Sequence, residues 1–226
     1  PPKKNFSTSD KRGRNNIHQD LALLERPRKH YQWYYSNESA NNDMVNCPQG
    51  LHNFLRAYYH MKSGDWLENE PFPLEQWDAA ELAKMPTYYI MDLNENMAQT
   101  VEHHKPTEDE IKNCIWLPEH ELKVYSEEYS RNGFQGGLQW YRCNTNPDII
   151  EELTLFSGST IDVNSMFIAG AKDWGIYQSP GAIETMQKTA CSKMKACHLV
   201  NGAGHWVQQE KPTEVSNLLL DFMDKQ

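Results

Sequence analysis

Hydrophobic residues along this chain recur at helical spacing up to about residue 145, and the spacing changes after about residue 150. Because strand-like runs are few between residues 20 and 145, this region is predicted to be mainly helical. A regular stripe of apolar residues in this region predicts an amphipathic helix with Pro48 in its first turn. The stripe that defines this helix runs in steps of three and four, through Leu51, Phe54, Leu55, Tyr58 and Met61.

Three more helices are predicted here from their start and stop signals. One follows Pro73. A second begins at Thr107, which forms a capping-box pair with Glu110. A third begins at Pro118, and Gly133 is expected to stop it because glycine readily adopts the conformation that ends helices.

The last part of the chain alternates strands with helices. Residues 165–170 and 196–200 are short apolar runs that are typical of strands. A helix is predicted between them after Ser179-Pro180, and another, capped by Thr213, after the second run. This order is typical of a parallel sheet. Since two parallel strands do not form a stable sheet alone, the segment is predicted to be the end of a larger doubly wound domain.

Charge and composition argue against two classes of partner. The chain has 226 residues and a formal net charge of −9, whereas binding to nucleic acid needs a basic face for the phosphates. No apolar run approaches the roughly 20 residues that cross a bilayer, so no membrane partner is expected. Residues 1–18 are polar and are predicted to be a solvated loop that holds Lys3, Lys4, Lys11, Arg12 and Arg14.

The cysteines favour a reducing compartment. Five thiols form an odd set without a C-x-x-C pair, which favours reduced cysteines and a cytoplasmic location over a disulfide framework. His103 and His104 follow an acid, but adjacent helical residues point apart, so neither a metal nor a cofactor is expected. The chain begins with Pro1 rather than methionine, and we therefore expect that its true N-terminus is missing.

An acid and a histidine follow the two predicted strands. Asp173 comes shortly after the first, and His205 follows the second in a glycine-containing turn. The carboxyl ends of parallel strands meet at one edge of a sheet, where substrates usually bind. An acid followed by a histidine is also the chain order of the last two members of a hydrolase triad. Two alternatives remain open: Asp173 as a turn cap and His205 as a structural histidine.

A nucleophile should precede both residues in such a triad. Ser157 and Ser179 are unsuited to this role, because neither occupies a G-x-S-x-G elbow between a strand and a helix. The sequence therefore contains no convincing nucleophile.

Four segments carry a family resemblance. They are His30-Tyr31-Gln32-Trp33-Tyr34, Gly133-Phe134-Gln135-Gly136-Gly137-Leu138-Gln139-Trp140-Tyr141-Arg142, Lys172-Asp173-Trp174 and Gly202-Ala203-Gly204-His205-Trp206. With these segments the chain resembles the epoxide-hydrolase-like branch of the α/β-hydrolase fold family.

The resemblance implies an α/β protein that forms the C-terminal part of an α/β-hydrolase fold, with a large, mainly helical lid before the strand-helix-strand-helix end of the sheet. The implied parts are a polar leader (1–18), a lid domain (19–155) enlarged by an insertion between about 42 and 115, and the core (156–226). The family's first strands, oxyanion loop and nucleophile elbow are absent from the sequence. The missing N-terminal half of the core is thus an expected partner, and a homodimer is left open.

The resemblance also assigns lid residues to the substrate. Tyr141 and Tyr31 would hydrogen-bond the epoxide oxygen and stabilise the charge that develops on it. Tyr34 and Tyr35 compete with Tyr31 for this role, since helical spacing places them close to it. The other expected substrate contacts are Gln32, Trp140, Trp174 and Trp206, although the two tryptophans next to the triad residues, Trp174 and Trp206, could equally pack beneath the pocket.

The expected activity is hydrolysis of a small-molecule epoxide. A carboxylate would attack the ring and form an aspartyl ester, and water activated by His205 would hydrolyse the ester while Asp173 orients the imidazole. A serine esterase or lactonase and a haloalkane dehalogenase are alternatives on the same fold. A truncated, inactive chain or a binding protein is a further alternative.

Overall fold

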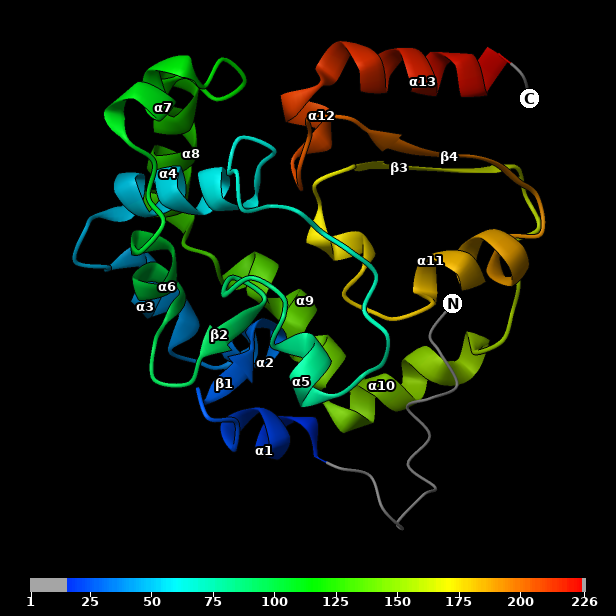
Figure 1. Ribbon diagram of the computed structural model, residues 1–226, viewed down its shortest axis with the longest axis horizontal. Helices are drawn as coiled ribbons and strands as arrows, with labels where there is room; N and C mark the ends of the chain where they lie inside the picture. Colours follow the sequence, from blue (N-terminus) through cyan, green and yellow to red (C-terminus); the bar gives the residue numbers. More distant parts are fainter. Residues whose placement is uncertain (1–15, 225–226) are drawn as a thin grey trace.

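The structure consists of a helical part and a smaller α/β part (Figure 1). The computed structural model describes residues 16–224, so the basic residues between positions 3 and 14 lie outside the described residues. The helical part extends through α10, and the α/β part follows it in the chain. Each part has its own buried apolar cluster, and Trp174, which follows the first long strand, packs into the cluster of the helical part.

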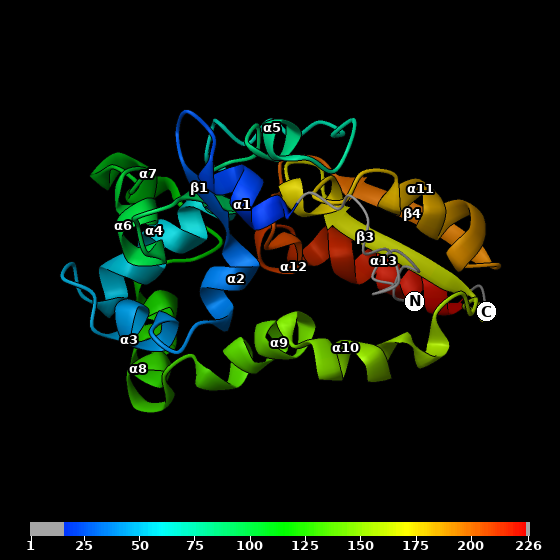
Figure 2. The ribbon, with the colours of Figure 1, turned by 90° about the horizontal axis from the view of Figure 1, so that it is seen from below.

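Short helices surround the core of the helical part. Tyr88, Tyr89, Phe54 and Met61 are among the largest side chains that are fully buried in this core. Figure 2 shows α9 and α10 running along one border of both parts. The helices are α1 (Ile17–Ala22), α2 (Tyr31–Ser36), α3 (Ala40–Val45), α4 (Leu51–Lys62), α5 (Ala79–Leu82), α6 (Met97–Glu102), α7 (Glu108–Asn113), α8 (Glu119–Asn132), α9 (Gln135–Thr145) and α10 (Pro147–Leu153).

Two helices have the ends that the sequence predicts. The capping box at the start of α7 is confirmed, with the Thr107 side chain accepting the Glu110 backbone N–H and the Glu110 side chain accepting that of Thr107. Helix α8 begins directly after Pro118 and ends at Gly133. Gly133 has a φ of +64°, and a Cβ there would lie 2.7 Å from the side-chain oxygen of Asn41. The backbone conformation therefore favours glycine at this position, whereas the side chain of Asn41 could move to make space.

Two other helices begin later than predicted. Helix α4 starts at Leu51, after Gly50 with a φ of +80°, so Pro48 lies outside its first turn. The positive φ breaks the helical path between the proline and the helix. The helix predicted after Pro73 is reduced to α5, because the Asp78 side chain accepts a backbone N–H of the first turn and fixes the start there.

Two features near the start of the described chain differ from the sequence prediction. The predicted loop through residue 18 is too long, because α1 begins at Ile17 and the Asn16 side chain caps it. A short antiparallel pair, β1 (Arg28–His30) with β2 (Ile90–Asp92), was not predicted. Strands of three residues are too short to show the alternating pattern that identifies strands in a sequence.

Two parallel strands form the centre of the α/β part, as predicted. Strand β3 (Ser165–Gly170) pairs with β4 (Met194–Val200), and α13 (Pro212–Asp224) and α11 (Ala182–Thr185) lie on opposite sides of the pair (Figures 1 and 2). The predicted cap at Thr213 is wrong, because α13 already begins at Pro212, whose fixed φ suits a first helical turn. The remaining elements are η2 (Thr154–Phe156), η3 (Trp174–Ile176), η4 (Met186–Ala190), a π-helical turn that continues α11, and α12 (Val207–Glu210).

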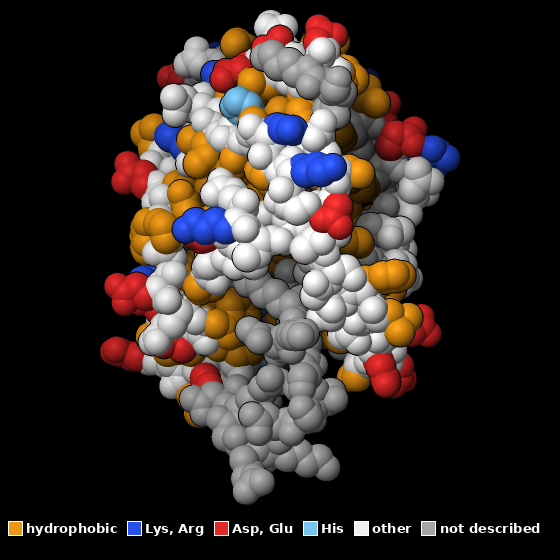
Figure 3. All heavy atoms as spheres, turned by 90° about the vertical axis from the view of Figure 1, so that its right-hand side faces the viewer, with side chains coloured by type: hydrophobic (Ala, Val, Ile, Leu, Met, Phe, Trp, Pro, Cys, Tyr) orange, Lys and Arg blue, Asp and Glu red, His pale blue; other side chains and the backbone are white. Residues whose placement is uncertain are grey.

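The α/β part leaves large apolar side chains exposed. Figure 3 views the molecule from the right-hand side of Figure 1 and shows hydrophobic patches between separate charged side chains. Within the described residues, the parallel sheet has two strands, which bury little of their own faces. The α/β part therefore fits the end of a larger sheet. The exposed side chains include Phe156, Val163, Leu199, Leu220 and Met223.

His30 caps α2 through a nitrogen that must be unprotonated. The residue is 2% exposed, and its Nδ1 accepts the backbone N–H of Gln32 at 3.3 Å. Burial, with a smaller contribution from the charge of His18, lowers the pKa of His30 to about 4. A proton on Nδ1 would turn the acceptor into a donor and break the cap.

We expect acidification to destabilise the fold through His30. Its folded-state pKa lies below the ordinary value of 6.5, so the stability is complete above pH 6.5 and is lost as the pH falls toward 4. This difference corresponds to about 3 kcal/mol in the free energy of unfolding. Urea denaturation near pH 7 and near pH 4.5 should show a smaller acid-induced loss for His30→Asn, because asparagine caps a helix without titrating. An equal loss in both proteins would contradict the prediction.

Candidate functional site

The backbones at the ends of β3 and β4 approach each other more closely than side chains would allow. A Cβ at Gly170 would lie 2.1 Å from the carbonyl oxygen of Gly204, and a Cβ at Gly204 would lie 2.5 Å from that of Lys62. Gly202 has a φ of +68°, in the left-handed region that favours glycine. The turn that carries His205 therefore packs against both the end of β3 and the end of α4.

Asp173 and His205 meet at this point, as expected for the carboxyl ends of neighbouring parallel strands. His205 Nδ1 and Asp173 Oδ2 are 3.1 Å apart. The other oxygen, Asp173 Oδ1, accepts the backbone N–H of Gly175 at 2.7 Å and caps η3. Asp173 is thus a turn cap and a partner of the histidine at once. With Nδ1 bound to the acid, Nε2 is the imidazole nitrogen that can take a proton from water.

The surroundings favour an ionised acid beside an uncharged imidazole. Burial opposes the ionisation of Asp173, but the hydrogen bond and charge of His205, with the Gly175 N–H, hold the pKa of Asp173 below its ordinary value. Burial lowers the pKa of His205, the positive charge of Lys62 lowers it further, and Asp173 opposes both. At neutral pH this combination suits a general base that an acid holds in one orientation.

The structure brings Tyr31 and Tyr141 together, and Tyr35 joins them. The ring of Tyr141 on α9 lies 5.8 Å from that of Tyr31 and 4.8 Å from that of Tyr35, between centroids. The ring of Tyr34 also lies near this group, 5.5 Å from that of Tyr35, but its hydroxyl donates to Asp43 at 3.2 Å. Burial raises the pKa of Tyr31, Tyr35 and Tyr141 above the ordinary value, so all three are neutral hydrogen-bond donors.

A chain of contacts connects the tyrosines with the Asp173–His205 pair. The backbone N–H of Tyr31 donates to the Tyr89 carbonyl at 2.9 Å, and the two rings are 5.1 Å apart. The Tyr89 hydroxyl lies 3.5 Å from Asp173 Oδ1. Gln32 Nε2 donates to the Tyr31 hydroxyl at 3.3 Å, so the Gln32 side chain helps to orient the Tyr31 phenol.

An aromatic cavity of about 650 Å³ lies against this group of tyrosines. Tyr141, Trp140 and Trp206 line it, whereas Trp174 is buried elsewhere, with its ring 5.0 Å from that of Phe72. Aspartate, glutamate, lysine and arginine are absent from the described residues that form its wall. Such a cavity suits an uncharged, apolar ligand. The other aromatic side chains of the wall are Tyr35, Phe54, Tyr58, Tyr59, Tyr129 and Phe134.

The sequence did not place three neighbours beside Asp173 and His205, although Tyr58 and Tyr89 could be expected in the lid interior or on its substrate-facing wall. Tyr89 contacts Asp173 as described, and the Tyr58 hydroxyl accepts a bond from that of Tyr35 at 3.2 Å. Lys62 lies one turn after Tyr58 on α4, and its carbonyl accepts the His205 N–H at 2.8 Å. The apolar stripe of α4 predicts Tyr58 as a core residue, but sequence spacing alone does not connect this helix with His205.

Glu210 holds the turn that carries His205. Its carboxylate accepts backbone N–H groups from Gly64 at 2.7 Å, Gly204 at 3.0 Å and Trp206 at 3.1 Å. Burial raises the pKa of Glu210, although these three bonds oppose the rise. The side chain therefore joins the end of α4 to both sides of the histidine.

Replacement of Glu210 by glutamine should destabilise the protein by about 3 kcal/mol. The amide would turn a donor toward backbone groups that are themselves donors, and buried N–H groups would lose their acceptor. Chemical denaturation measures the change, and Glu214→Gln on an exposed position of α13 is the matched control, expected within about 0.5 kcal/mol of the parent. Equal stability of the two variants would show that the hydrogen bonds of the Glu210 carboxylate do not stabilise the turn that carries His205.

One of the two adjacent histidines, His103, has an acidic partner nearby in the chain. His103 Nε2 lies 2.7 Å from Glu95 Oε1, and no group of three potential metal-binding side chains occurs in residues 16–224. The described helices include none with the length and apolar character to cross a membrane. All five cysteines are free thiols.

Sequence comparisons relate this chain to epoxide hydrolases. Epoxide hydrolase A of Mycobacterium tuberculosis is 41% identical over 112 residues, which are 48% of this chain and 32% of that protein. Epoxide hydrolase 2 of Siraitia grosvenorii is 35% identical over 115 residues, which are 49% of this chain and 35% of that protein. The match thus spans about a third of the length of these relatives. No protein-family model matches the chain.

Structure comparisons extend the similarity to nearly the whole chain. An epoxide hydrolase from an endophytic Streptomyces matches with a TM-score of 0.66 and 25% identity, over 94% of this chain and 57% of that structure. Epoxide hydrolase A from Mycobacterium thermoresistibile matches with a TM-score of 0.60 and 27% identity, over 90% of this chain and 54% of that structure. The predicted α/β-hydrolase fold and the predicted resemblance to epoxide hydrolases are confirmed.

Proposed function

We propose that this chain, which has an α/β-hydrolase fold and is related to the epoxide hydrolases, supplies the base and the phenolic donors of an epoxide-opening site. One observation carries the proposal: the turn that carries His205 contributes one residue, Trp206, to the wall of the tyrosine-lined cavity, whereas Tyr31, Asp173 and His205 themselves are not part of this wall. Trp206 follows His205 directly and lines that cavity together with Tyr141. A substrate in the cavity would therefore contact the Tyr141 phenol and the Trp206 ring of the histidine turn at the same time.

In the first proposed step, a carboxylate oxygen bonds to a carbon of the epoxide, and the bond from that carbon to the ring oxygen breaks. The electron pair of the broken bond remains on the ring oxygen. Tyr141 and Tyr31 hydrogen-bond this oxygen, and one of them gives it a proton. Tyr35, whose ring is nearer to Tyr141 than that of Tyr31, is a candidate for the second phenol.

In the second proposed step, His205 Nε2 takes a proton from water, and the hydroxide attacks the ester carbonyl carbon. The bond from this carbon to the alcohol oxygen breaks, which releases a diol and restores the carboxylate. Asp173 stabilises the imidazolium that forms, and the imidazolium returns its proton to the phenolate. No external oxidant, reductant or metal enters this balance.

We infer that the attacking carboxylate belongs to polypeptide outside these 226 residues. Asp173, the acid at the site, is already bound to His205 and Gly175. The apolar side chains exposed around β4 and α13 give such a segment a surface to cover. The relatives, which extend well beyond the matched region, are consistent with this arrangement.

A chimera tests the proposal, with this chain replacing the region that it overlays in the Streptomyces epoxide hydrolase. It should convert an uncharged aryl epoxide to the diol, and His205→Gln should accumulate an ester. Intact-mass spectrometry should then show the protein heavier by the whole mass of the epoxide, because ring opening loses no atoms. Unimpaired turnover of the His205→Gln chimera would reject the role of this histidine.

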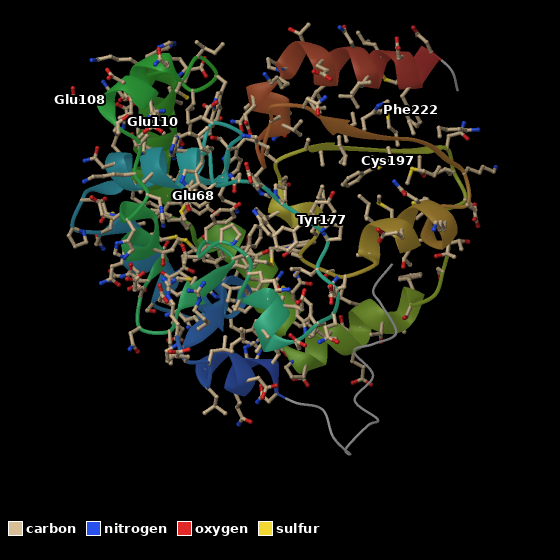
Figure 4. The ribbon with its side chains drawn as sticks, viewed as in Figure 1. Glu68, Glu108, Glu110, Tyr177, Cys197 and Phe222 are labelled. Atoms are coloured by element: carbon tan, nitrogen blue, oxygen red, sulfur yellow. The ribbon has the colours of Figure 1, made fainter. Side chains whose placement is uncertain are left out.

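In the same chimera, Tyr141→Phe should slow epoxide opening by about 100-fold or more, because a donor to the developing alkoxide is lost. Tyr177→Phe is the matched control, since this tyrosine lies on the segment between β3 and α11 and is not part of the cavity wall (Figure 4). Single-turnover rates measure the effect. Any hydrolysis of simple esters should survive Tyr141→Phe, and equal loss of both activities would indicate that the tyrosine is structural.

A further inference from the structure

Lys62, the last residue of α4, is a buried cation in an aromatic cage. The residue is 5% exposed. Its Nζ donates to the Tyr58 hydroxyl at 3.3 Å, and none of the ion pairs among the described residues includes it. Four rings surround the ammonium at 5.1 to 5.8 Å from their centroids: Tyr58, Tyr88, Tyr89 and Trp206. Ring faces stabilise a cation but do not neutralise it.

The cage lies directly beside the Asp173–His205 pair. One of its rings, Tyr89, has its hydroxyl 3.5 Å from Asp173. Another, Trp206, follows His205 in the chain, and their ring centroids are 4.9 Å apart. The Lys62 carbonyl accepts the backbone N–H of His205 at 2.8 Å. Main-chain and side-chain contacts therefore both fix the ammonium relative to the acid and the base.

We propose that Lys62 is a positioning residue whose caged charge keeps His205 uncharged while Asp173 stays ionised. An ionised acid beside a histidine favours the imidazolium, which is not a base. A second, positive charge nearby opposes this and also favours the ionised acid. The charge of Lys62 accordingly lowers the pKa of both His205 and Asp173.

Other titratable groups surround this arrangement. Lys172 Nζ donates to the Gly64 carbonyl at 3.2 Å, and the carboxylate of Glu210 accepts the backbone N–H groups of Gly64, Gly204 and Trp206. Asp65 follows Gly64, and its carboxylate accepts from Trp116 at 2.7 Å. The charges of Lys62 and Asp173 act on the pKa of His205 in opposite directions. The phenols of Tyr58, Tyr88 and Tyr89 around Lys62, with that of Tyr31, are further titratable groups near the pair.

The base role of His205 rests on the proposed function, but the effect of Lys62 on its charge does not. The test is therefore an NMR titration of the His205 imidazole in the 226-residue chain, with the resonance assigned by its loss in His205→Gln. Lys62→Met removes the charge and keeps an apolar chain in the cage. It should raise the pKa of His205 by about half a unit or more, at least threefold in proton affinity.

Three variants separate charge from packing. Lys62→Arg keeps the charge, and Tyr58→Phe keeps the ring but removes the hydroxyl that accepts from Lys62 and from Tyr35, so both variants should leave the pKa of His205 within about 0.2 units of the parent. Lys172→Met makes the same chemical change at the neighbouring lysine and should also leave it there. An unchanged pKa in Lys62→Met, or the same rise in Lys62→Arg, would overturn the proposal. Lys62→Gln is a second neutral variant, to be used if the amide spectrum of Lys62→Met shows a loss of fold.

Discussion

Backbone contact among Gly64, Gly170 and Gly204 is the constraint on which this site depends. Each of these glycines lies where a Cβ would meet the main chain of another segment, so the end of α4 and the ends of both strands pack directly against one another. Because of this contact, the Lys62 carbonyl can accept the backbone N–H of His205, and the Glu210 carboxylate can accept backbone N–H groups from both the end of α4 and the turn. Helix α4 of the helical part thus contributes to the conformation of the turn that carries His205.

The same packing separates charged groups from the apolar cavity. Trp206 forms part of the cavity wall, and its Nε1 donates to the Tyr59 carbonyl at 2.9 Å, which fixes the plane of the ring. Lys62 lies against this ring too. The cavity wall carries neutral phenols, whereas Asp173 and Lys62 provide opposite charges next to His205. Because Coulomb interactions are stronger where water is excluded, a small number of fixed charges is enough to set the protonation of the imidazole.

Local sequence signals predicted the elements that stand on their own. Helix α8 follows from Pro118 and Gly133, and β3 and β4 follow from apolar runs, so the meeting of Asp173 with His205 could be predicted from strand topology. Local sequence signals could not predict contacts between segments that are distant in the chain. The β1–β2 pair is too short for a pattern, and the choice among tyrosines depends on how α2 packs against α9. The caged Lys62 and the hydrogen bonds of the Glu210 carboxylate likewise depend on tertiary contacts.

The distribution of contacts also limits what a complementary polypeptide has to provide. Asp173 is oriented by Gly175 and Tyr89, His205 by Lys62 and Asp173, and Tyr31 by Gln32 and the Tyr89 carbonyl, all within the described chain. If the proposed function holds, a partner segment has to extend the sheet and present one carboxylate to an already oriented pair. Such a segment would bury the apolar surface around β4 and α13, and this burial would drive the association. The interface that buries this apolar surface would then both stabilise the completed sheet and position the nucleophilic carboxylate.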